Sequence, residues 1–336
     1  MTINDLGYNE DLDKFRTEQN LASFELGRVI SEHKERYVVK NTENEYDSEL
    51  IGNLRFSAES RYDYPAVGDW VAFSEYDEGK ALIHAIYPRN SIIERQAVGK
   101  SGQVQIIATN IDYGLIVQAV DRDFNLNRLE RYLTVCNASK VEPIIVLSKI
   151  DLISERELES INEQVTQRIK GVSIIPVSME ASGYDQLKEV IEAGKTYCLL
   201  GSSGVGKSTL LNGLLGKLQM KTSEISSSVN KGKHTTSHRE LIVLEDGGII
   251  IDNPGMREVG IADTASGLEI TFEAILEYAE NCRFKDCTHT HEKGCAVLEA
   301  LEDGEIDEAA YANFRKMEKE KMHFESDAQE RRKKEN

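Results

Sequence analysis

Residues 199–208 read Leu199-Leu200-Gly201-Ser202-Ser203-Gly204-Val205-Gly206-Lys207-Ser208, which matches the pattern G-x-x-x-x-G-K-[ST]. An apolar run precedes the pattern and a helical run follows it, which is the strand–loop–helix context of a phosphate-binding loop. The glycines let backbone N–H groups curl around phosphate oxygens, and the helix N-terminus adds the positive end of its dipole. A Gly- and Ser-rich turn that matched by coincidence would lack these flanking elements. The pattern predicts a nucleotide site with contacts from Gly201, Ser202, Ser203, Gly204, Val205, Gly206, Lys207, Ser208 and Thr209.

A second motif is expected to complete the phosphate and Mg²⁺ contacts. In the first motif, Lys207 would reach the β- and γ-phosphates and the Ser208 hydroxyl would bind Mg²⁺. The apolar run 248–251 then leads into the sequence DNPG, which has the form D-x-x-G. Asp252 would hold a magnesium-bound water, and the Gly255 amide would contact the γ-phosphate. A turn without function has the same form, but the position after a phosphate loop and an apolar strand favours the functional interpretation.

The polar segment 223–238 lies between these two motifs and is rich in Ser, Thr and Gly. A loop that orders around a magnesium-bound γ-phosphate needs one threonine for the metal. Thr236 is the favoured metal ligand, and Thr235 is the alternative. A flexible loop without a metal role would leave the position of these threonines between the two motifs unexplained.

Two loops are expected to read the base. Guanine is distinguished from adenine by a carboxylate that accepts hydrogen bonds from its N1 and N2 groups. The sequence IVLSKID at 145–151 places Lys149 and Asp151 just beyond an apolar strand, in the pattern [N/T/S]-K-x-D. Asp151 would read the base and the Lys149 stem would cover its face. After the next strand, Ser178 and Met179 form a second loop whose backbone N–H would reach guanine O6.

The order of these motifs is unusual, because base-reading motifs ordinarily follow the phosphate loop and here they precede it. Loops at the carboxyl ends of parallel strands share one edge of the sheet wherever the chain begins. The order therefore indicates a circularly permuted domain. Permutation also joins the segment after Gly255 directly to the C-terminal region.

The rest of the chain supports a multidomain architecture. Short β-rich runs at 27–30, 36–39, 70–73 and 81–83 favour a small barrel, and an OB-fold suits about seventy residues of this kind. From about residue 104, apolar strands alternate with helices, which predicts a parallel sheet covered on both faces. The expected strands are 113–120, 143–147, 172–177, 197–200, 240–244 and 248–251. The expected helices are 128–139, 155–169, 184–191 and one that begins at 207, and the chain after about 263 is expected to be helical.

Three cysteines and a histidine crowd into one short segment, Cys282-x₄-Cys287-x-His289-x₅-Cys295. Three thiolates and one imidazole form a complete tetrahedral set for Zn²⁺. Because four protein ligands leave no open position, the metal is expected to be structural. His291 is an alternative to His289 as the fourth ligand.

Composition sets further limits on function. The 336 residues carry a net charge of −18, which argues against indiscriminate nucleic-acid binding and leaves room for local basic surfaces such as the run 331–334. The apolar runs are too short to cross a bilayer, and the first residues are too acidic for a signal peptide. We expect a cytoplasmic protein without disulfides or membrane contact.

Taken together, these motifs resemble the ribosome small-subunit-dependent GTPase A family (RsgA, also called YjeQ or YloQ). The resemblance runs from the sequence VGDW at 67–70 through the permuted motifs to the cysteine cluster. It implies an N-terminal OB-fold β-barrel, a circularly permuted α/β P-loop GTPase domain and a C-terminal helical zinc-binding domain. The expected boundaries are 1–20 for a mobile segment, 21–98 for the barrel, 99–262 for the GTPase domain and 263–336 for the zinc-binding domain with its charged tail.

The resemblance also implies function and residue roles. It implies hydrolysis of GTP to GDP during late maturation of the small ribosomal subunit, stimulated by that rRNA-rich particle, and we expect the protein to act as a monomer. It favours His289 as the fourth zinc ligand. Ser148 departs from the asparagine that many GTPases have there, so its nucleotide contact is shorter or lost.

The residue that orients the attacking water is less directly indicated. Many GTPases place a glutamine after D-x-x-G for this purpose, but this chain has Met256. His234 is the candidate, because it is polar, lies in the loop near Thr236, and corresponds to a histidine in similar proteins. Simple solvent exposure is the alternative for a lone loop histidine.

Three other functions are compatible with parts of the sequence. A nucleotide-gated RNA-binding module with incidental hydrolysis would be expected to have lost Lys207, Ser208 or Asp252, and all three are present. An ATPase or small-molecule kinase would use the same phosphate loop, but Asp151 favours guanine. A purely structural zinc-and-barrel protein would not explain the middle of the chain.

Overall fold

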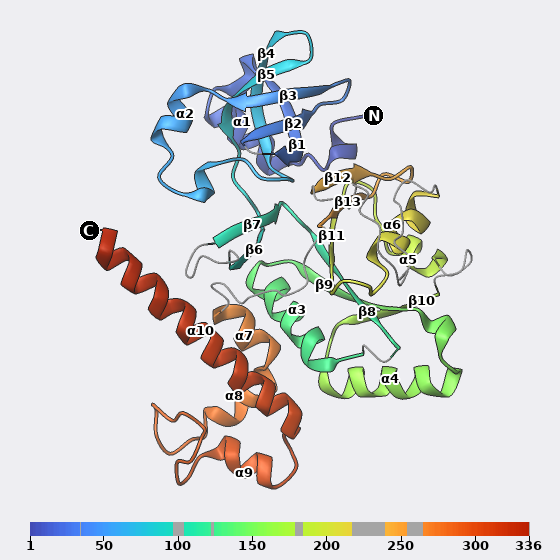
Figure 1. The fold of residues 1–336 in the computed structure, drawn as a ribbon, viewed down its shortest axis with the longest axis vertical. Coiled ribbons are helices and arrows are strands. Elements are labelled where there is room, and N and C mark those ends of the chain that lie inside the picture. The colour runs from blue at the N-terminus through green and yellow to red at the C-terminus, as the bar shows by residue number, and fades with distance from the viewer. Residues whose placement is uncertain are drawn as a thin grey trace, which may run out of the picture.

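The computed structural model describes residues 1–33, 35–96, 104–121, 124–178, 184–216, 239–253 and 265–335. Figure 1 shows a barrel formed by the N-terminal part of the chain, a sheet with helices in the middle and a helical unit at the C-terminal end. This arrangement confirms the expected multidomain architecture.

The N-terminal barrel has the strand order of an OB-fold. Strand β1 pairs with both β2 and β4, so the order β1-β2-β3-β5-β4 closes on itself, and β3 runs parallel to β5. The strands are β1 (Glu25–His33), β2 (Arg36–Lys40), β3 (Glu45–Leu50), β4 (Trp70–Asp77) and β5 (Lys80–Ile86), with α2 (Gly52–Ser57) and η3 (Arg61–Asp63) between β3 and β4. The sequence predicted all of these strands except β3, where only Tyr46 and Ser48 are buried and charged side chains hide the alternation.

Residues 1–20, expected to be mobile, are packed against the barrel. They form η1 (Asn4–Leu6) and α1 (Glu10–Glu18), and the Asn9 side chain caps α1; η2 (Leu21–Ser23) follows. Leu6 and Leu12 are buried in one cluster with Trp70 and Tyr87. The sequence analysis missed this contact because the segment is mostly polar and packs through few apolar side chains, with Leu6 of η1 and Leu12 of α1 buried.

The middle of the chain forms a sheet in the order β10-β9-β8-β11-β13-β12. Its strands are β8 (Tyr113–Ala119), β9 (Glu142–Ser148), β10 (Ser173–Val177), β11 (Thr196–Leu200), β12 (Glu240–Val243) and β13 (Ile249–Asp252). The predicted parallel arrangement is correct for the five strands β10, β9, β8, β11 and β13, whereas β12 runs antiparallel to β13. A short turn joins β12 to β13, and so short a connection permits only antiparallel pairing.

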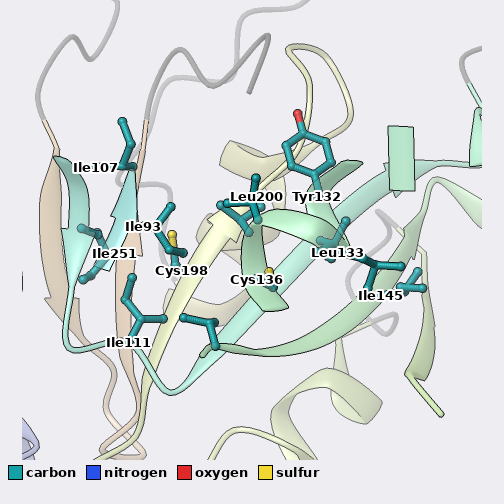
Figure 2. Close-up of a cluster of buried hydrophobic side chains, with 14 of the residues drawn as sticks. Ile93, Ile107, Ile111, Tyr132, Leu133, Cys136, Ile145, Cys198, Leu200 and Ile251 are labelled. Atoms are coloured by element: carbon teal, nitrogen blue, oxygen red, sulfur yellow. The ribbon is translucent and has the colours of Figure 1, made fainter. Parts of the chain in front are cut away.

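Helices cover both faces of this sheet, as predicted. They are α3 (Leu126–Ala138), α4 (Glu155–Arg168), α5 (Asp185–Glu189) and α6 (Lys207–Leu215). One core contains Leu133 of α3 and Val165 of α4, and the other contains Leu187 of α5 and Leu210 of α6. Figure 2 shows part of the first core.

The barrel and the sheet are joined in two places. Strand β1 pairs with β12 at Ser31 and Glu240, so barrel and sheet form one continuous hydrogen-bonded unit. An antiparallel ribbon of β6 (Ile92–Gln96) and β7 (Val104–Thr109) connects them in the chain. The proposed boundary between residues 98 and 99 lies outside the described residues.

A buried arginine lies at the same junction. Arg28 of β1 is 1% exposed and donates to the Gly68 carbonyl at 3.0 Å, the Leu6 carbonyl at 2.7 Å, the Asn110 carbonyl at 2.9 Å and the Thr196 hydroxyl at 3.0 Å. Burial lowers the pKa of Arg28 to about 10. The guanidinium therefore links the N-terminal segment, the barrel and β11 through hydrogen bonds that offset its desolvation.

The C-terminal helices are α7 (Ala265–Thr271), α8 (Glu273–Ala279), α9 (Ala296–Glu302) and α10 (Glu308–Glu335). Of these, α7 and α10 pack on α3. A Cβ added at Gly267 of α7 would lie 2.1 Å from the Thr134 carbonyl oxygen of α3, so the two helices touch through their backbones. Figure 1 shows α10 running past α7, with its C-terminal end at the edge of the molecule. Within the described ranges, no helix is both long and apolar enough to cross a bilayer.

Candidate nucleotide site and metal centre

The phosphate loop joins β11 to α6, as the sequence predicted. Gly201 has φ +144°, and a Cβ there would lie 2.4 Å from the Val117 carbonyl oxygen. Gly204 and Gly206 have φ +85° and +101°, in the left-handed region that side chains disfavour. The loop can therefore curl back toward the N-terminus of α6 only with glycine at these positions.

Asp252 ends β13, which pairs in parallel with β11, and Lys207 is the first residue of α6, which follows the loop after β11. Burial lowers the pKa of Lys207 to about 8, and the nearby Asp252 carboxylate opposes this shift. Burial likewise raises the pKa of Asp252, which is 5% exposed, and Lys207 opposes that shift. The Lys207 ammonium donates to the carbonyl oxygens of Gly201 at 2.6 Å and Ser202 at 2.7 Å. A cation and a carboxylate that interact electrostatically therefore lie where phosphate and metal are expected.

Ser148 is fully buried at the end of β9, and its hydroxyl donates to the Val205 carbonyl oxygen at 2.6 Å. This bond connects the strand before the base-reading loop to the phosphate loop. Ser148 therefore supports the loop directly, a contact that the sequence analysis did not predict.

The described residues of the two predicted base-reading loops lie together at the carboxyl ends of β9 and β10. Asp151 lies in η4 (Ile150–Leu152), and the Ser178 hydroxyl donates to its Oδ1 at 3.3 Å. Lys149 precedes η4 with φ +61°. Its ammonium lies 3.0 Å from Oδ2 of Asp121, which follows β8. The sequence analysis missed Asp121, although an acidic residue directly after an apolar strand beside β9 was a usable signal.

The other predicted phosphate contacts are placed unequally. Ser208 and Thr209 are partly exposed in the first turn of α6, and Ser203 is exposed in the loop. The remaining predicted residues lie outside the described residues: Met179, His234, Thr235, Thr236 and Gly255. Their roles stay predictions.

The predicted metal ligands converge in the C-terminal unit. The ligand atoms of Cys282, Cys287, His289 and Cys295 all lie within 4.8 Å of one another. Cys282 Sγ is 3.8 Å from Cys295 Sγ and 3.6 Å from His289 Nδ1, which is 3.4 Å from Cys295 Sγ. A tetrahedral zinc with bonds of about 2.3 Å to sulfur and 2.0–2.1 Å to nitrogen would separate the sulfurs by about 3.8 Å and sulfur from nitrogen by about 3.5 Å. The cluster can hold a metal ion, and its spacing suits one of this size.

Two of the four ligands, Cys282 and His289, have pKa shifts that favour the metal-binding form. Burial acts to raise the pKa of Cys282, but N–H groups of Val297 and Ala296 and the adjacent thiols lower it overall. Burial lowers the pKa of His289, which favours the neutral imidazole that binds metals. His291, the alternative ligand, instead has its Nδ1 2.8 Å from the Thr290 hydroxyl.

A buried polar network, which the sequence analysis missed, joins the GTPase domain to α10. Glu130 of α3 is 3% exposed and accepts from Arg168 Nε at 2.6 Å and Nη2 at 2.8 Å, and from Asn313 Nδ2 at 2.6 Å. Burial raises the pKa of Glu130, while Arg168 and Asn313 oppose that shift. Arg131 forms a second, bidentate pair with Glu320, at 2.7 and 2.8 Å. The metal-binding unit is therefore fixed to α3 by directional contacts.

Comparison with known proteins identifies the family. The family described as RsgA GTPase matches residues 86–262. This chain belongs to the RsgA GTPase family. The small ribosomal subunit biogenesis GTPase RsgA 1 of Bacteroides thetaiotaomicron is 38% identical over 98% of this chain and 92% of its own length. RsgA 2 of Lactiplantibacillus plantarum is 43% identical, over 88% of this chain and 83% of its own length.

Solved structures support the same fold. YjeQ from Thermotoga maritima matches with a TM-score of 0.64 and 26% identity, over 87% of this chain and 96% of its own. YloQ, a circularly permuted GTPase, matches with a TM-score of 0.61 and 23% identity, over 92% and 96%. The predicted RsgA resemblance, GTPase activity and permuted domain are thereby confirmed. The chain order agrees, because the loops after β9 and β10 precede the phosphate loop after β11.

Proposed function

We propose that this GTPase acts in late maturation of the small ribosomal subunit and that the subunit stimulates its hydrolysis of GTP. The relatives with up to 43% identity are named small ribosomal subunit biogenesis GTPases, and they match most of this chain. The observation that carries a working nucleotide site is the electrostatic interaction between Lys207, at the start of α6 after the phosphate loop, and Asp252, at the end of the neighbouring strand β13.

The phosphate contacts follow from that arrangement. The backbone N–H groups of residues 201–209 would bind the phosphates at the N-terminus of α6. Lys207 would exchange its loop carbonyls for β- and γ-phosphate oxygens, and Ser208 would bind Mg²⁺. Asp252 would hold a water of that metal, and Gly255 would contact the γ-phosphate. These groups would neutralise the charge that spreads over the phosphate oxygens during hydrolysis.

Base selection would come from the two loops at the ends of β9 and β10. Asp151 would accept hydrogen bonds from guanine N1 and N2, and the Lys149 stem would cover the base. Ser178 would orient the Asp151 carboxylate through their 3.3 Å hydrogen bond. A backbone N–H at Met179 would reach guanine O6. Ser148 would contribute indirectly, because its hydroxyl donates to the Val205 carbonyl of the phosphate loop.

The hydrolytic water and the partner are proposed together. His234 would orient the attacking water, and Thr236 would complete the Mg²⁺ shell when the loop orders on the ribosomal subunit. Turnover would then be slow alone and faster with the subunit, and His234→Ala would depress the stimulated rate while GTP still bound. Stimulated turnover that His234→Ala left unchanged would remove this residue from the mechanism.

The metal in the cysteine cluster would be a structural Zn²⁺. The ligand set of Cys282, Cys287, His289 and Cys295 and the separations of their atoms suit this ion. The protein would act as a monomer in the cytoplasm and contact rRNA through limited basic surfaces, with the run 331–334 as one candidate.

The decisive measurement is steady-state GTP hydrolysis by the purified protein, with and without small ribosomal subunits. We expect slow turnover alone and a strong increase with subunits, both abolished in Lys207→Ala. Subunits that bind but leave turnover unchanged would favour the alternative of a nucleotide-gated RNA-binding module. Large ribosomal subunits provide the matched control for a nonspecific effect of RNA.

Base selection is tested by changing the base and the residue together. An amide at Asp151→Asn can donate to the C2 carbonyl of xanthine, whereas the wild-type carboxylate can only accept from guanine. We therefore expect Asp151→Asn to weaken GTP binding and strengthen binding of xanthosine triphosphate. Unchanged preference would show that another group reads the base.

A further inference from the structure

An ion pair outside the predicted motifs adjoins the base-reading loops. Oδ2 of Asp121 lies 3.0 Å from Nζ of Lys149, and the two side chains are only 22% and 20% exposed. Asp121 follows β8, which lies in the sheet between β9 and β11. The carboxylate is therefore at the same edge of the sheet as the base-reading loop and the phosphate loop.

Both the backbone and the side-chain ammonium of Lys149 are held in place. Its backbone has φ +61°, an uncommon conformation for a residue with a side chain, and it leads into η4, where Asp151 lies. The Val120 N–H donates to the Ser148 carbonyl at 3.1 Å, which extends the ladder between β8 and β9 up to the two residues that form the pair. The ladder thus holds the backbone of both partners, and the ion pair holds the ammonium.

We propose that Asp121 is a positioning residue for the guanine nucleotide, because it anchors the Lys149 ammonium so that the aliphatic stem lies ready to cover the base. This inference rests on the proposed base-reading role of Lys149. A lysine side chain is flexible, and a site that must restrict it upon binding loses affinity. The carboxylate also balances the ammonium charge, so that the stem meets the base as an apolar surface.

The test measures the dissociation constant and kcat for GTP and for inosine triphosphate, which lacks the N2 amino group. Asp121→Asn keeps the shape of the side chain and removes its charge. We expect its dissociation constants for both nucleotides to rise by the same factor, about threefold to tenfold, with kcat unchanged. Asp121→Glu should recover part of the loss. In a Lys149→Ala background, Asp121→Asn should have no further effect, because the ammonium it anchors is gone.

Asp112→Asn is the matched control, because Asp112 precedes the same strand at the opposite edge of the sheet and lies 3.4 Å from Lys195. This variant should leave nucleotide affinity unchanged. Affinity that Asp121→Asn leaves unchanged, or a loss that persists in the Lys149→Ala background, would overturn the positioning role. ATP binding to the wild-type protein is measured in parallel. If the wild-type protein prefers GTP to ATP, failure of the Asp121 proposal leaves the proposed GTPase function intact. If it shows no such preference, the proposed base-reading site and the role of Asp121 are both overturned.

Discussion

The Ser148 hydroxyl donates a 2.6 Å hydrogen bond to the carbonyl oxygen of Val205, and both residues are buried. The bond joins the strand that carries the base-reading loop to the loop that is expected to bind phosphate. Many GTPases have asparagine at this position, and the shorter serine still reaches the phosphate loop. The Ser148 hydroxyl therefore links the two loops that are expected to bind the nucleotide.

Removal of this hydroxyl should weaken nucleotide binding. Ser148→Ala leaves the buried Val205 carbonyl without this donor, at a cost of about 1 kcal/mol, so the dissociation constant for GTP should rise about fivefold. Ser57→Ala is the matched control, because its hydroxyl also donates to a backbone carbonyl, that of Leu54, but on the barrel surface. Equal GTP affinity in both variants would show that the Ser148 bond does not support the loop.

The partly buried Lys207 should destabilise the nucleotide-free protein at neutral pH. Its folded pKa of about 8 lies below the ordinary value of 10.5, so both states are protonated below pH 8 and the fold bears the full desolvation cost. As pH rises from 8 to 10.5, the folded state releases its proton first and stability increases. Lys207→Met should therefore be more stable at pH 7, by about 1–3 kcal/mol. Loss of the counter-charge of Asp252 reduces this gain. The variant should also fail to bind GTP.

Calorimetric unfolding of both proteins between pH 7 and 10 checks this prediction. The difference between the two melting temperatures should shrink as pH rises, because other titrating groups are common to both. A difference that stays constant would show that the Lys207 proton is not the cause.

The network between α3, α4 and α10 should contribute strongly to stability. Glu130→Ala would remove the buried carboxylate partner of the Arg168 guanidinium, whose side chain is 9% exposed, and leave it the exposed Asp307 carboxylate at 3.6 Å. Loss of one partner of a buried pair typically costs about 3–5 kcal/mol. Glu45→Ala, which breaks an exposed pair with Lys40, should change the free energy of unfolding by less than about 1 kcal/mol. Urea titration compares the two, and similar losses would contradict the prediction.

Zinc binding should depend on His289 and not on His291. His289 Nδ1 lies 3.4 Å from Cys295 Sγ, whereas His291 is directed to Thr290. His289→Ala should lose most bound zinc and unfold the C-terminal unit at lower temperature, and His291→Ala should retain full zinc content. Metal analysis after dialysis, followed by thermal unfolding with and without chelator, provides the measurement. Zinc loss in His291→Ala instead would reverse the assignment of the fourth ligand.

Prediction of helices and strands failed where few side chains are buried or where charged residues interrupt the apolar pattern. In β3 only two side chains point inward, and in α1 only Leu12 is buried, so neither segment shows the apolar periodicity on which sequence analysis depends. The direction of β12 was also missed, because strand direction follows from the length of the connection and not from side-chain pattern. The long apolar strands β8, β9 and β11 were predicted correctly because their burial on both faces leaves a continuous signal.

The sequence by itself determined the phosphate loop and the cysteine cluster. In both, the contacting groups lie within a few residues of one another, and local backbone geometry brings them together, through Gly201 and Gly206 in the loop and through the turn at His289 in the cluster. Only the tertiary structure decided which distant side chains support them. Asp121 reaches Lys149 across 28 residues, Ser148 reaches Val205 across 57, and Asn313 reaches Glu130 across 183. Such pairs depend on the order of strands in the sheet and on helix packing, and no local pattern in the chain encodes either.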